Sequence, residues 1–210
     1  MLLAIDTATH VLSIALATET HVIAETTWKT NNQHSVELAP AIERLLQQTG
    51  STPHNLSALA VAQGPGSFTG VRIGLGLAKG MALALSIPLI PVQTLDTIAE
   101  GTPPSPQPLT AVIQAGRSRI IAAPYRHQGE QWIQSGELVL TTWEDLIPQL
   151  PVGTICNGEL DAHGLELLQA HRIQVMPLGW QIRRAGFLAQ VAWRRPAAPD
   201  PALVMPIYMK

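Results

Sequence analysis

The sequence predicts an α/β fold whose first half is organised around a mixed five-stranded sheet. Three strand candidates joined by short turns come first, at Leu2 to Ile5, Val11 to Ala17 and His21 to Trp28, and such a run is typical of an antiparallel meander. Strands then alternate with helices, which indicates parallel pairing. Three meander strands followed by two strand–helix units are the arrangement of a ribonuclease-H-like or actin-like half.

The first helix follows a polar loop at residues 31–35. Pro40 lies in its first turns and is expected to kink the helix or shift its start, and Gly50 is suited to end it. Apolar residues recur there with helical spacing: Leu38, Ala41, Ile42, Leu45 and Leu46.

A glycine-rich turn from Gly64 to Gly74 joins a strand at Leu59 to Ala62 to a helix from Thr69 to Ser86. Ser67 or Thr69 can cap that helix. Free N–H groups at such a helix start can hold a phosphate, but the spacing is G-x-G-x-x-x-G and the Lys-Ser/Thr pair of a P-loop is absent. The favoured interpretation is that the glycines let the helix pack closely on a sheet.

This helix has few charges, since only an arginine and a lysine interrupt it, so a helix covered on most sides is predicted. At about 100° per residue, Gly70 and Gly74 fall on one stripe and Gly76 and Gly80 on another, nearly opposite. One flank is expected to meet the protein's own sheet, and the other a second internal layer or another polypeptide. The two charges and the short apolar runs argue against a membrane span.

The rest of the chain predicts a strand at Leu89 to Val92, a short helix at Leu95 to Ala99 and a proline-rich boundary at 101–108. Further strands are expected at 109–113, 120–123, 132–140 and 154–157, and helices at 143–150, 160–170 and 181–193. We therefore predict an N-terminal subdomain at 1–102, a smaller, degenerate α/β subdomain at 103–195, and a proline-rich linker and tail at 196–210, whose end can dock as a strand.

Composition excludes several classes of protein. The 210 residues are 46% apolar and 13% charged, with a net charge of −2, so a self-sufficient nucleic-acid binder is not indicated. One cysteine, Cys156, excludes an internal disulfide and a CxxC zinc module and suits a reducing cytoplasm. It is expected to be a small buried hydrophobe. No secretion signal is indicated, and a cytoplasmic protein without a membrane partner is expected.

Candidate catalytic residues are sparse. Asp6 with Thr7 and Thr9 is similar to the first phosphate loop of actin-like ATPases, but Ala8 stands where glycine would help and no second loop matches. The alternative is that these residues satisfy backbone groups at a turn. No histidines form an H-x-x-x-H pair, and Ser67 does not lie in a nucleophile elbow. No catalytic, metal or cofactor residue is predicted.

Four arginines near the C-terminus, Arg183, Arg184, Arg194 and Arg195, are predicted to stack into one basic stripe, because eleven residues is close to three helical turns. The stripe could touch RNA phosphates, or it could be a solvated helix face.

Three segments together resemble the TsaB family, also called YeaZ. They are Leu3 to Thr9, His34-Ser35 before the first helix, and G-P-G-S-F-T-G-x-R-I-G from Gly64 to Gly74 with the helix that follows. The ending Pro206 to Lys210 is similar to the family's P-x-Y-x-R/K. The segment Gln114 to Ile121 departs from the family's D-A-R-x-G-E-V-Y, with both acidic positions and one arginine changed.

The resemblance implies an actin-like two-subdomain fold and a non-catalytic paralogue of TsaD. Such a protein would pair with TsaD, and with the ATPase TsaE, to make N6-threonylcarbamoyladenosine in tRNAs that read codons beginning with A, and would form homodimers when isolated. An ATP-dependent phosphotransferase and a peptidase are the alternatives. We place the partner interface on the two long helices, at His34, Leu38, Ile42, Leu45, Phe68, Val71, Arg72, Leu75 and Lys79.

Overall fold

A computed structural model describes residues 1–209 of the chain. It contains two compact units, which are described separately. Unit 1 comprises residues 1–97 and 184–208, and residues 98–183 form the body of unit 2. The division falls inside helix α3 (Thr94–Glu100).

Unit 1 contains a mixed sheet of five strands in the order β3-β2-β1-β4-β5. The first three strands form an antiparallel meander, while β4 pairs in parallel with both β1 and β5. The predicted five-stranded sheet and its actin-like, ribonuclease-H-like order are confirmed. The strands are β1 (Leu2–Asp6), β2 (Val11–Ala17), β3 (Val22–Lys29), β4 (Ala58–Gly64) and β5 (Leu89–Gln93).

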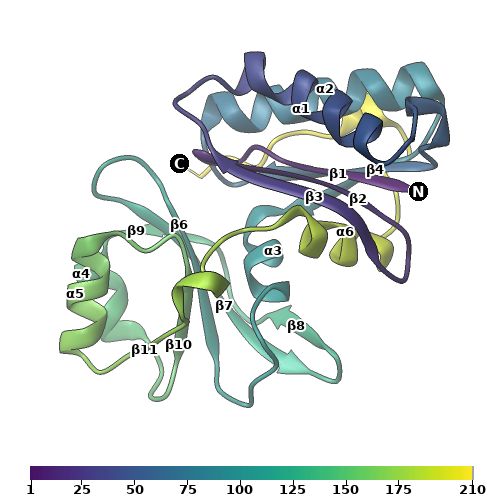
Figure 1. Cartoon of the computed structure of the whole chain (residues 1–210). Coiled ribbons are helices and arrows are strands. Elements are labelled where there is room, and N and C mark those ends of the chain that lie inside the picture. The colour runs from purple at the N-terminus through teal and green to yellow at the C-terminus, as the bar shows by residue number, and fades with distance from the viewer. Residues whose placement is uncertain (210) are drawn as a thin grey trace. The chain divides into compact units, whose positions relative to one another are not determined.

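Helices cover both faces of this sheet (Figure 1). The helices α1 (His34–Gln48) and α2 (Phe68–Leu85) lie on one face, and α6 (Ala185–Trp193) lies on the other. Strand β1 is therefore buried along its whole length, and it reads as a continuous apolar run up to Asp6, as expected for a strand covered on both sides. The core of unit 1 lies in these two layers.

The position of α6 corrects the predicted boundaries. Its buried residues, including Leu188 and Ala192, belong to the apolar core of unit 1, so the last part of the predicted subdomain 103–195 packs elsewhere. The helix is also shorter than the predicted 181–193. A sequence can indicate that a helix is apolar, but not which of two sheets it returns to.

Two further sequence predictions concern the effect of Pro40 on α1 and the docking of the C-terminal tail as a strand. The helix runs through Pro40 without a shifted start and ends at Gln48, followed by the C-cap residue Thr49 and by Gly50 at φ +63°. Residues 205–209 of the tail form no strand, although the Ile207 N–H donates to the Gln63 carbonyl at 2.8 Å, and Lys210 lies outside the described residues. A short 3₁₀ turn, Pro201–Leu203, precedes it, and another, Pro53–Asn55, follows α1.

Unit 2 repeats the strand order of unit 1 in a six-stranded sheet. Its path is β8-β7-β6-β10-β11, with an antiparallel hairpin followed by parallel strands, and β9 pairs with β7. The predicted echo of the first half is thus present. The strands are β6 (Leu109–Gln114), β7 (Ile120–Gln128), β8 (Gln131–Gln134), β9 (Val139–Thr141), β10 (Ile155–Gly158) and β11 (Gln174–Val175).

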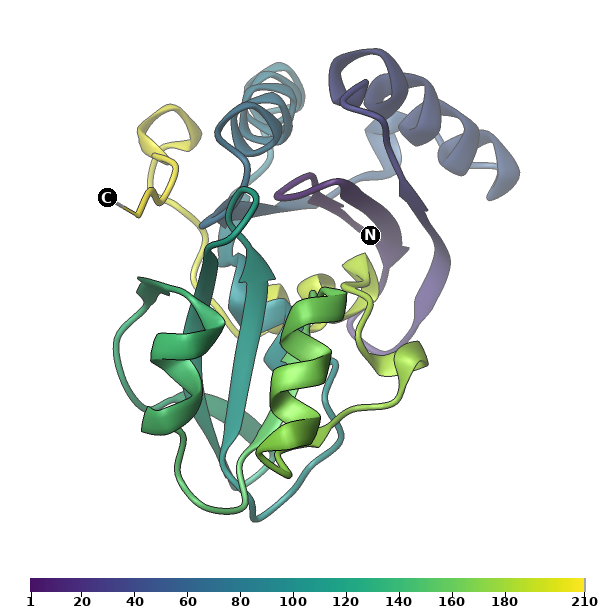
Figure 2. The same ribbon diagram turned by 90° about the vertical axis from the view of Figure 1, so that its left-hand side faces the viewer.

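The helices α4 (Trp143–Leu146) and α5 (Ala162–Ala170) cover one face of that sheet (Figure 2). Trp143 is the largest side chain in this layer, and its indole packs against Gly164 and donates to Asp161 Oδ1 at 3.0 Å. The predicted strand at 132–140 is two separate strands, β8 and β9. Short 3₁₀ turns occupy Ile147–Gln149 and Leu178–Trp180.

Candidate protein-docking surface

The glycine-rich turn packs against the turn between β1 and β2. A Cβ added to Gly66 would lie 2.1 Å from the Ala8 carbonyl oxygen, and one added to Gly70 would lie 2.3 Å from that of Thr7. The Ser67 N–H donates to the Ala8 carbonyl at 2.6 Å. The start of α2 therefore meets the protein's own backbone where a phosphate cradle would need open N–H groups, and the close-packing interpretation of the glycines holds.

The polar residues of the β1–β2 turn have structural roles. The Asp6 carboxylate is fully buried and accepts the Ala8 N–H at 2.9 Å. The Thr7 hydroxyl donates to the Gly70 carbonyl at 2.8 Å, and His34 Nε2 lies 2.8 Å from the Thr9 carbonyl. Within residues 1–209, no group of three or more His, Cys, Asp or Glu residues is placed to hold a metal ion.

The candidate nucleophiles are also engaged or buried. Ser67 caps α2, accepting the Gly70 N–H at 3.3 Å. Cys156 is fully buried in unit 2, and burial raises the pKa of its thiol to about 12, so a thiolate is not formed near neutral pH.

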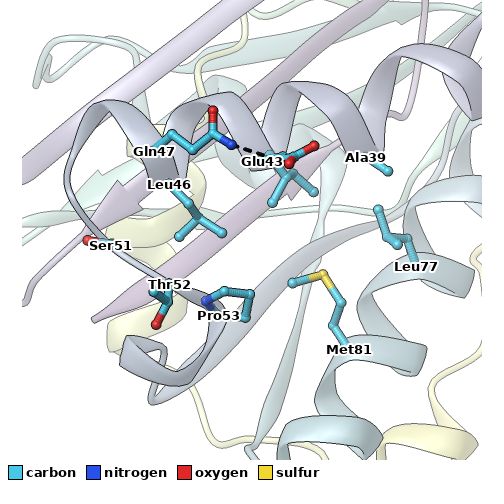
Figure 3. Close-up of a pocket in the computed structure, with 10 residues that line it drawn as sticks. Ala39, Glu43, Leu46, Gln47, Ser51, Thr52, Pro53, Leu77 and Met81 are labelled. Atoms are coloured by element: carbon cyan, nitrogen blue, oxygen red, sulfur yellow. Dashed lines mark hydrogen bonds between the residues drawn. The ribbon is translucent and has the colours of Figure 1, made fainter.

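In contrast to the buried β1–β2 turn, the outer side of α1 and α2 contains an open apolar groove. The groove has a volume of about 450 Å³ and runs between the two helices and the 3₁₀ turn after α1 (Figure 3). Leu46, Leu77 and Met81 form its apolar floor, while the linked Glu43 and Gln47 side chains lie at one rim. The full lining is Ala39, Ile42, Glu43, Leu46, Gln47, Ser51, Thr52, Pro53, Leu77 and Met81.

The exposed face of α2 continues this groove. At about 100° per residue, Gly76 and Gly80 lie opposite the residues buried on the sheet, and a Cβ at either glycine would meet nothing within 4 Å. Two large apolar side chains stay exposed nearby in the sequence, Val36 on α1 at 69% and Leu83 on α2 at 56%. We call the groove and this glycine line together the α1–α2 face.

The two predicted glycine stripes therefore have different surroundings. Gly70 and Gly74 are in close contact with Thr7, as expected for the flank that meets the protein's own sheet. Gly76 and Gly80 face open space, so a second internal layer does not cover them in the described residues.

Most of the predicted interface residues lie inside the protein. Leu38, Leu45, Val71 and Leu75 are core residues of unit 1, and His34 is buried against Thr9. The interface prediction places the stripe of Val71 and Leu75 against a partner, whereas the sheet of unit 1 covers that stripe. Ile42 is mostly buried too, but it lines the groove.

The C-terminal segment lies beside α2 (Figure 2), and three other predicted interface residues contact it. The guanidinium of Arg72 lies 3.5 Å from the Phe68 ring centroid and donates to the Tyr208 hydroxyl at 2.6 Å. The Phe68 and Tyr208 rings stack with centroids 5.0 Å apart. Lys79 donates to the Ala202 carbonyl at 2.9 Å. This flank of α2 is thus covered by the chain itself.

The predicted arginine stripe is not formed, because α6 begins at Ala185 and is too short to carry it. Arg183 precedes the helix and is only 2% exposed, paired with Glu159 at 2.5 Å. Arg184 pairs with Glu25 and Arg195 with Asp96. Arg194 is the C-cap residue of α6.

Sequence reasoning did not identify Leu46, Leu77 and Met81 as residues that line the groove, because it considered only one apolar stripe on each helix. The signal that could have found Leu77 and Met81 is their helical position, since at about 100° per residue both lie between the core stripe of α2 and the second glycine stripe.

Comparisons with known proteins identify the family to which the chain belongs. The family model described as TsaD, tRNA N6-adenosine threonylcarbamoyltransferase, matches residues 21–160. The tRNA threonylcarbamoyladenosine biosynthesis protein TsaB of Bacillus subtilis is 36% identical over 151 residues, which are 70% of this chain and 66% of that protein. The chain belongs to the TsaB (YeaZ) family.

Other relatives agree with this assignment. TsaB of Escherichia coli is 39% identical over 129 residues, covering 61% of this chain and 52% of that protein. The matches thus span about half to two thirds of these TsaB proteins' own length. The solved structure of YeaZ from Pseudomonas aeruginosa has the same fold, with a TM-score of 0.80, 24% identity and 99% of each chain covered.

The length and apolar composition of α2 have a structural explanation. The helix is long and apolar enough, by length and composition alone, to cross a membrane. Its Val71, Ala78 and Ala82 belong to the core of unit 1, so the apolar character is used at least in part for packing on the sheet.

Proposed function

We propose that the chain is a non-catalytic partner of a TsaD protein, acting with the ATPase TsaE in the cytoplasm to form N6-threonylcarbamoyladenosine in tRNAs that read codons beginning with A. The observation that carries the proposal is the α1–α2 face, an apolar groove beside an open glycine line, in a chain of the TsaB family. An apolar surface of this kind is typical of a site where another protein docks.

The geometry of the α1–α2 face favours helices as its occupant. Gly76 and Gly80 are spaced four residues apart on one line of α2, and small side chains let a second backbone approach closely. The apolar floor beside them can bury large side chains of the incoming helix. A helix pair from a TsaD chain is the proposed occupant, and a second copy of this chain would compete for the same face.

A scaffold role is favoured over the two enzymatic alternatives. An ATPase would need a phosphate site at the β1–β2 turn, but the Ala8 carbonyl accepts the Ser67 N–H there. A peptidase would need a free nucleophile, but Ser67 caps α2 and the Cys156 thiol is buried with a raised pKa.

Gly80→Leu provides the first test. The added side chain enters open space, and leucine favours the helix over glycine by roughly 0.8 kcal/mol, so the chain stays folded. It should prevent close approach of a partner helix and weaken association with TsaD by about tenfold or more, which is about 1.4 kcal/mol. Association is measured by calorimetry or interferometry with the full chain.

The matched control is Gln169→Leu, which adds the same side chain at an exposed position of α5. It should leave association unchanged. In a reconstituted tRNA-modification assay, omitting the chain should abolish product, and Gly80→Leu should reduce it more than Gln169→Leu does. If TsaD binds Gly80→Leu with unchanged affinity, the docking face lies elsewhere. If product forms without the chain, its role as a required partner is wrong.

A further inference from the structure

The loop between β6 and β7 presents a pair of arginines to solvent. Arg117 and Arg119 are both exposed at the end of this hairpin, and neither side chain has a hydrogen bond or an ion pair to any residue in 1–209. The loop is closed by the Ala115 N–H, which donates to the Arg119 carbonyl at 2.8 Å. We call residues 115–119 the hairpin tip.

The base of the hairpin is fixed by a charged brace. The Gln114 N–H donates to Glu159 Oε2 at 3.3 Å, and its side-chain amide donates to the Glu159 carbonyl at 3.2 Å. Arg183 donates to Glu159 Oε1 at 2.5 Å and is almost fully buried. The tip therefore stands on a supported base, in which the carboxylate of the brace is already neutralised by Arg183.

The charges of the hairpin tip depart from the pattern that the family resemblance implies. Where the family resemblance shows D-A-R-x-G-E-V-Y, this chain has Gln114-Ala115-Gly116-Arg117-Ser118-Arg119-Ile120-Ile121. Arg119 stands at the acidic position near the end of the pattern, and Gln114 at the first. The segment from 114 to 121 has no acidic residue and carries two positive charges at its exposed end.

We propose that the hairpin tip binds the phosphate backbone of RNA. A guanidinium group presents planar N–H donors that match phosphate oxygens, often in a bidentate arrangement, and it stays charged at any physiological pH. Two unpaired arginines on a braced loop can contact phosphates without first breaking an ion pair. In contrast, Arg183, Arg184 and Arg195 would each have to give up a carboxylate partner.

The choice of tRNA as the RNA rests on the proposed function. The tip supplies a cationic contact in a chain whose overall charge is −2, so it would orient a tRNA held mainly by other subunits rather than bind it alone with high affinity. Backbone contacts of this kind position an RNA and carry no sequence information.

The test compares two double variants of the full chain. Arg117→Gln/Arg119→Gln removes the tip charges, and Arg126→Gln/Arg172→Gln removes two other exposed charges from the same unit. Binding of an unmodified tRNA transcript is measured by fluorescence anisotropy over a series of salt concentrations, with the isolated chain and with the TsaD-containing complex.

The tip variant should flatten the slope of log affinity against log salt by about 1.5, since each phosphate contact contributes roughly 0.7 to 0.9. The control variant should change the slope little. Equal losses in both variants, or none in the tip variant, would overturn the proposal, as would equal binding of heparin in place of tRNA. TsaD association and tRNA modification are measured on the same variants, so a failure of the proposed function is recognised separately.

Discussion

Two turns occupy the same place in the topology of the two units, but one turn is buried and the other is exposed to solvent. The β1–β2 turn of unit 1 and the β6–β7 turn of unit 2 each join the central strand of a sheet to its antiparallel neighbour. Asp6, Thr7 and Ala8 are fully buried under the start of α2, whereas residues 116–119 are exposed. The covering element, more than the hairpin itself, decides whether such a turn is core or available for binding.

The means of holding each turn differ as well. Unit 1 uses close packing of glycine against backbone, beside the buried Asp6 carboxylate that accepts the Ala8 N–H. Unit 2 uses the brace of Gln114, Glu159 and Arg183. Unit 1 should therefore be sensitive to added volume at its turn, and unit 2 to removed charge.

Added volume at the first turn should have the largest effect. In Gly70→Ala, the new Cβ would lie 2.3 Å from the Thr7 carbonyl oxygen, a backbone atom that cannot rotate away. Overpacking usually costs 1 to 3 kcal/mol, and we expect about 3 kcal/mol or more here. Chemical denaturation followed by circular dichroism measures the loss.

Gly76→Ala is the control in the same helix, because its Cβ meets nothing within 4 Å. Alanine is a better helix former than glycine, so this variant should gain roughly 0.5 to 1 kcal/mol. Equal stability of the two variants would mean that α2 is free to shift away from the β1–β2 turn, and the close-packed description of unit 1 would be wrong.

Removed charge at the second turn should have the next largest effect. Glu159→Gln removes the negative charge that pairs with the buried Arg183 guanidinium. Loss of one partner from a fully buried pair costs 3 to 5 kcal/mol, and because Glu159 is 17% exposed, we expect about 2 to 3 kcal/mol. The measurement is the protection of unit 2 amides against hydrogen exchange.

Glu144→Gln is the matched control, since Glu144 pairs with His163 at a fully exposed site of the same unit. It should change amide protection very little. If Glu159→Gln is no more destabilising than Glu144→Gln, the brace does not hold the hairpin, and the hairpin tip would have no fixed base.

Much of the fold could be predicted from local pattern. The alternation of short strands and turns from Leu2 to Trp28, followed by strand–helix units, was sufficient for the order of the first sheet. The return of α6 to that sheet was not predictable, because its apolar residues suit either unit equally well. Separation of the predicted strand at 132–140 into β8 and β9 depends on pairing with β7, which a local pattern does not contain.

The candidate site was less accessible from sequence. Apolar residues at helical spacing could be found, but Leu75 and Leu77 differ by two positions, and only the direction of the sheet decides which is core and which lines the groove. Whether a charged side chain is buried in an ion pair or exposed was equally hard to predict from the sequence. Arg183 and Arg117 are both arginines near polar residues, yet one is buried in an ion pair that brings together residues 24 positions apart, and the other is exposed.

The smallest expected effect concerns the exposed pair of unit 2. The Glu144 carboxylate, whose Oε1 lies 2.6 Å from His163 Nε2, raises the pKa of His163 above its ordinary value of 6.5, and the same bond lowers the pKa of Glu144 below 4.5. The histidine contribution to stability is fully present below pH 6.5 and is lost as the pH rises through the raised value. The glutamate contribution is present above pH 4.5 and is lost as the pH falls through the lowered value.

His163→Gln tests this pair, which links α5 to α4. Because both side chains are exposed, solvent screens their interaction, and the difference in unfolding temperature from the parent chain should be small. It should be largest between the two pKa values and vanish at alkaline pH, while Gly70→Ala should lose stability at every pH, since its cause is steric. Proton NMR of the His163 ring gives its pKa directly. A pKa at or below 6.5 would show that the pair is not formed in solution.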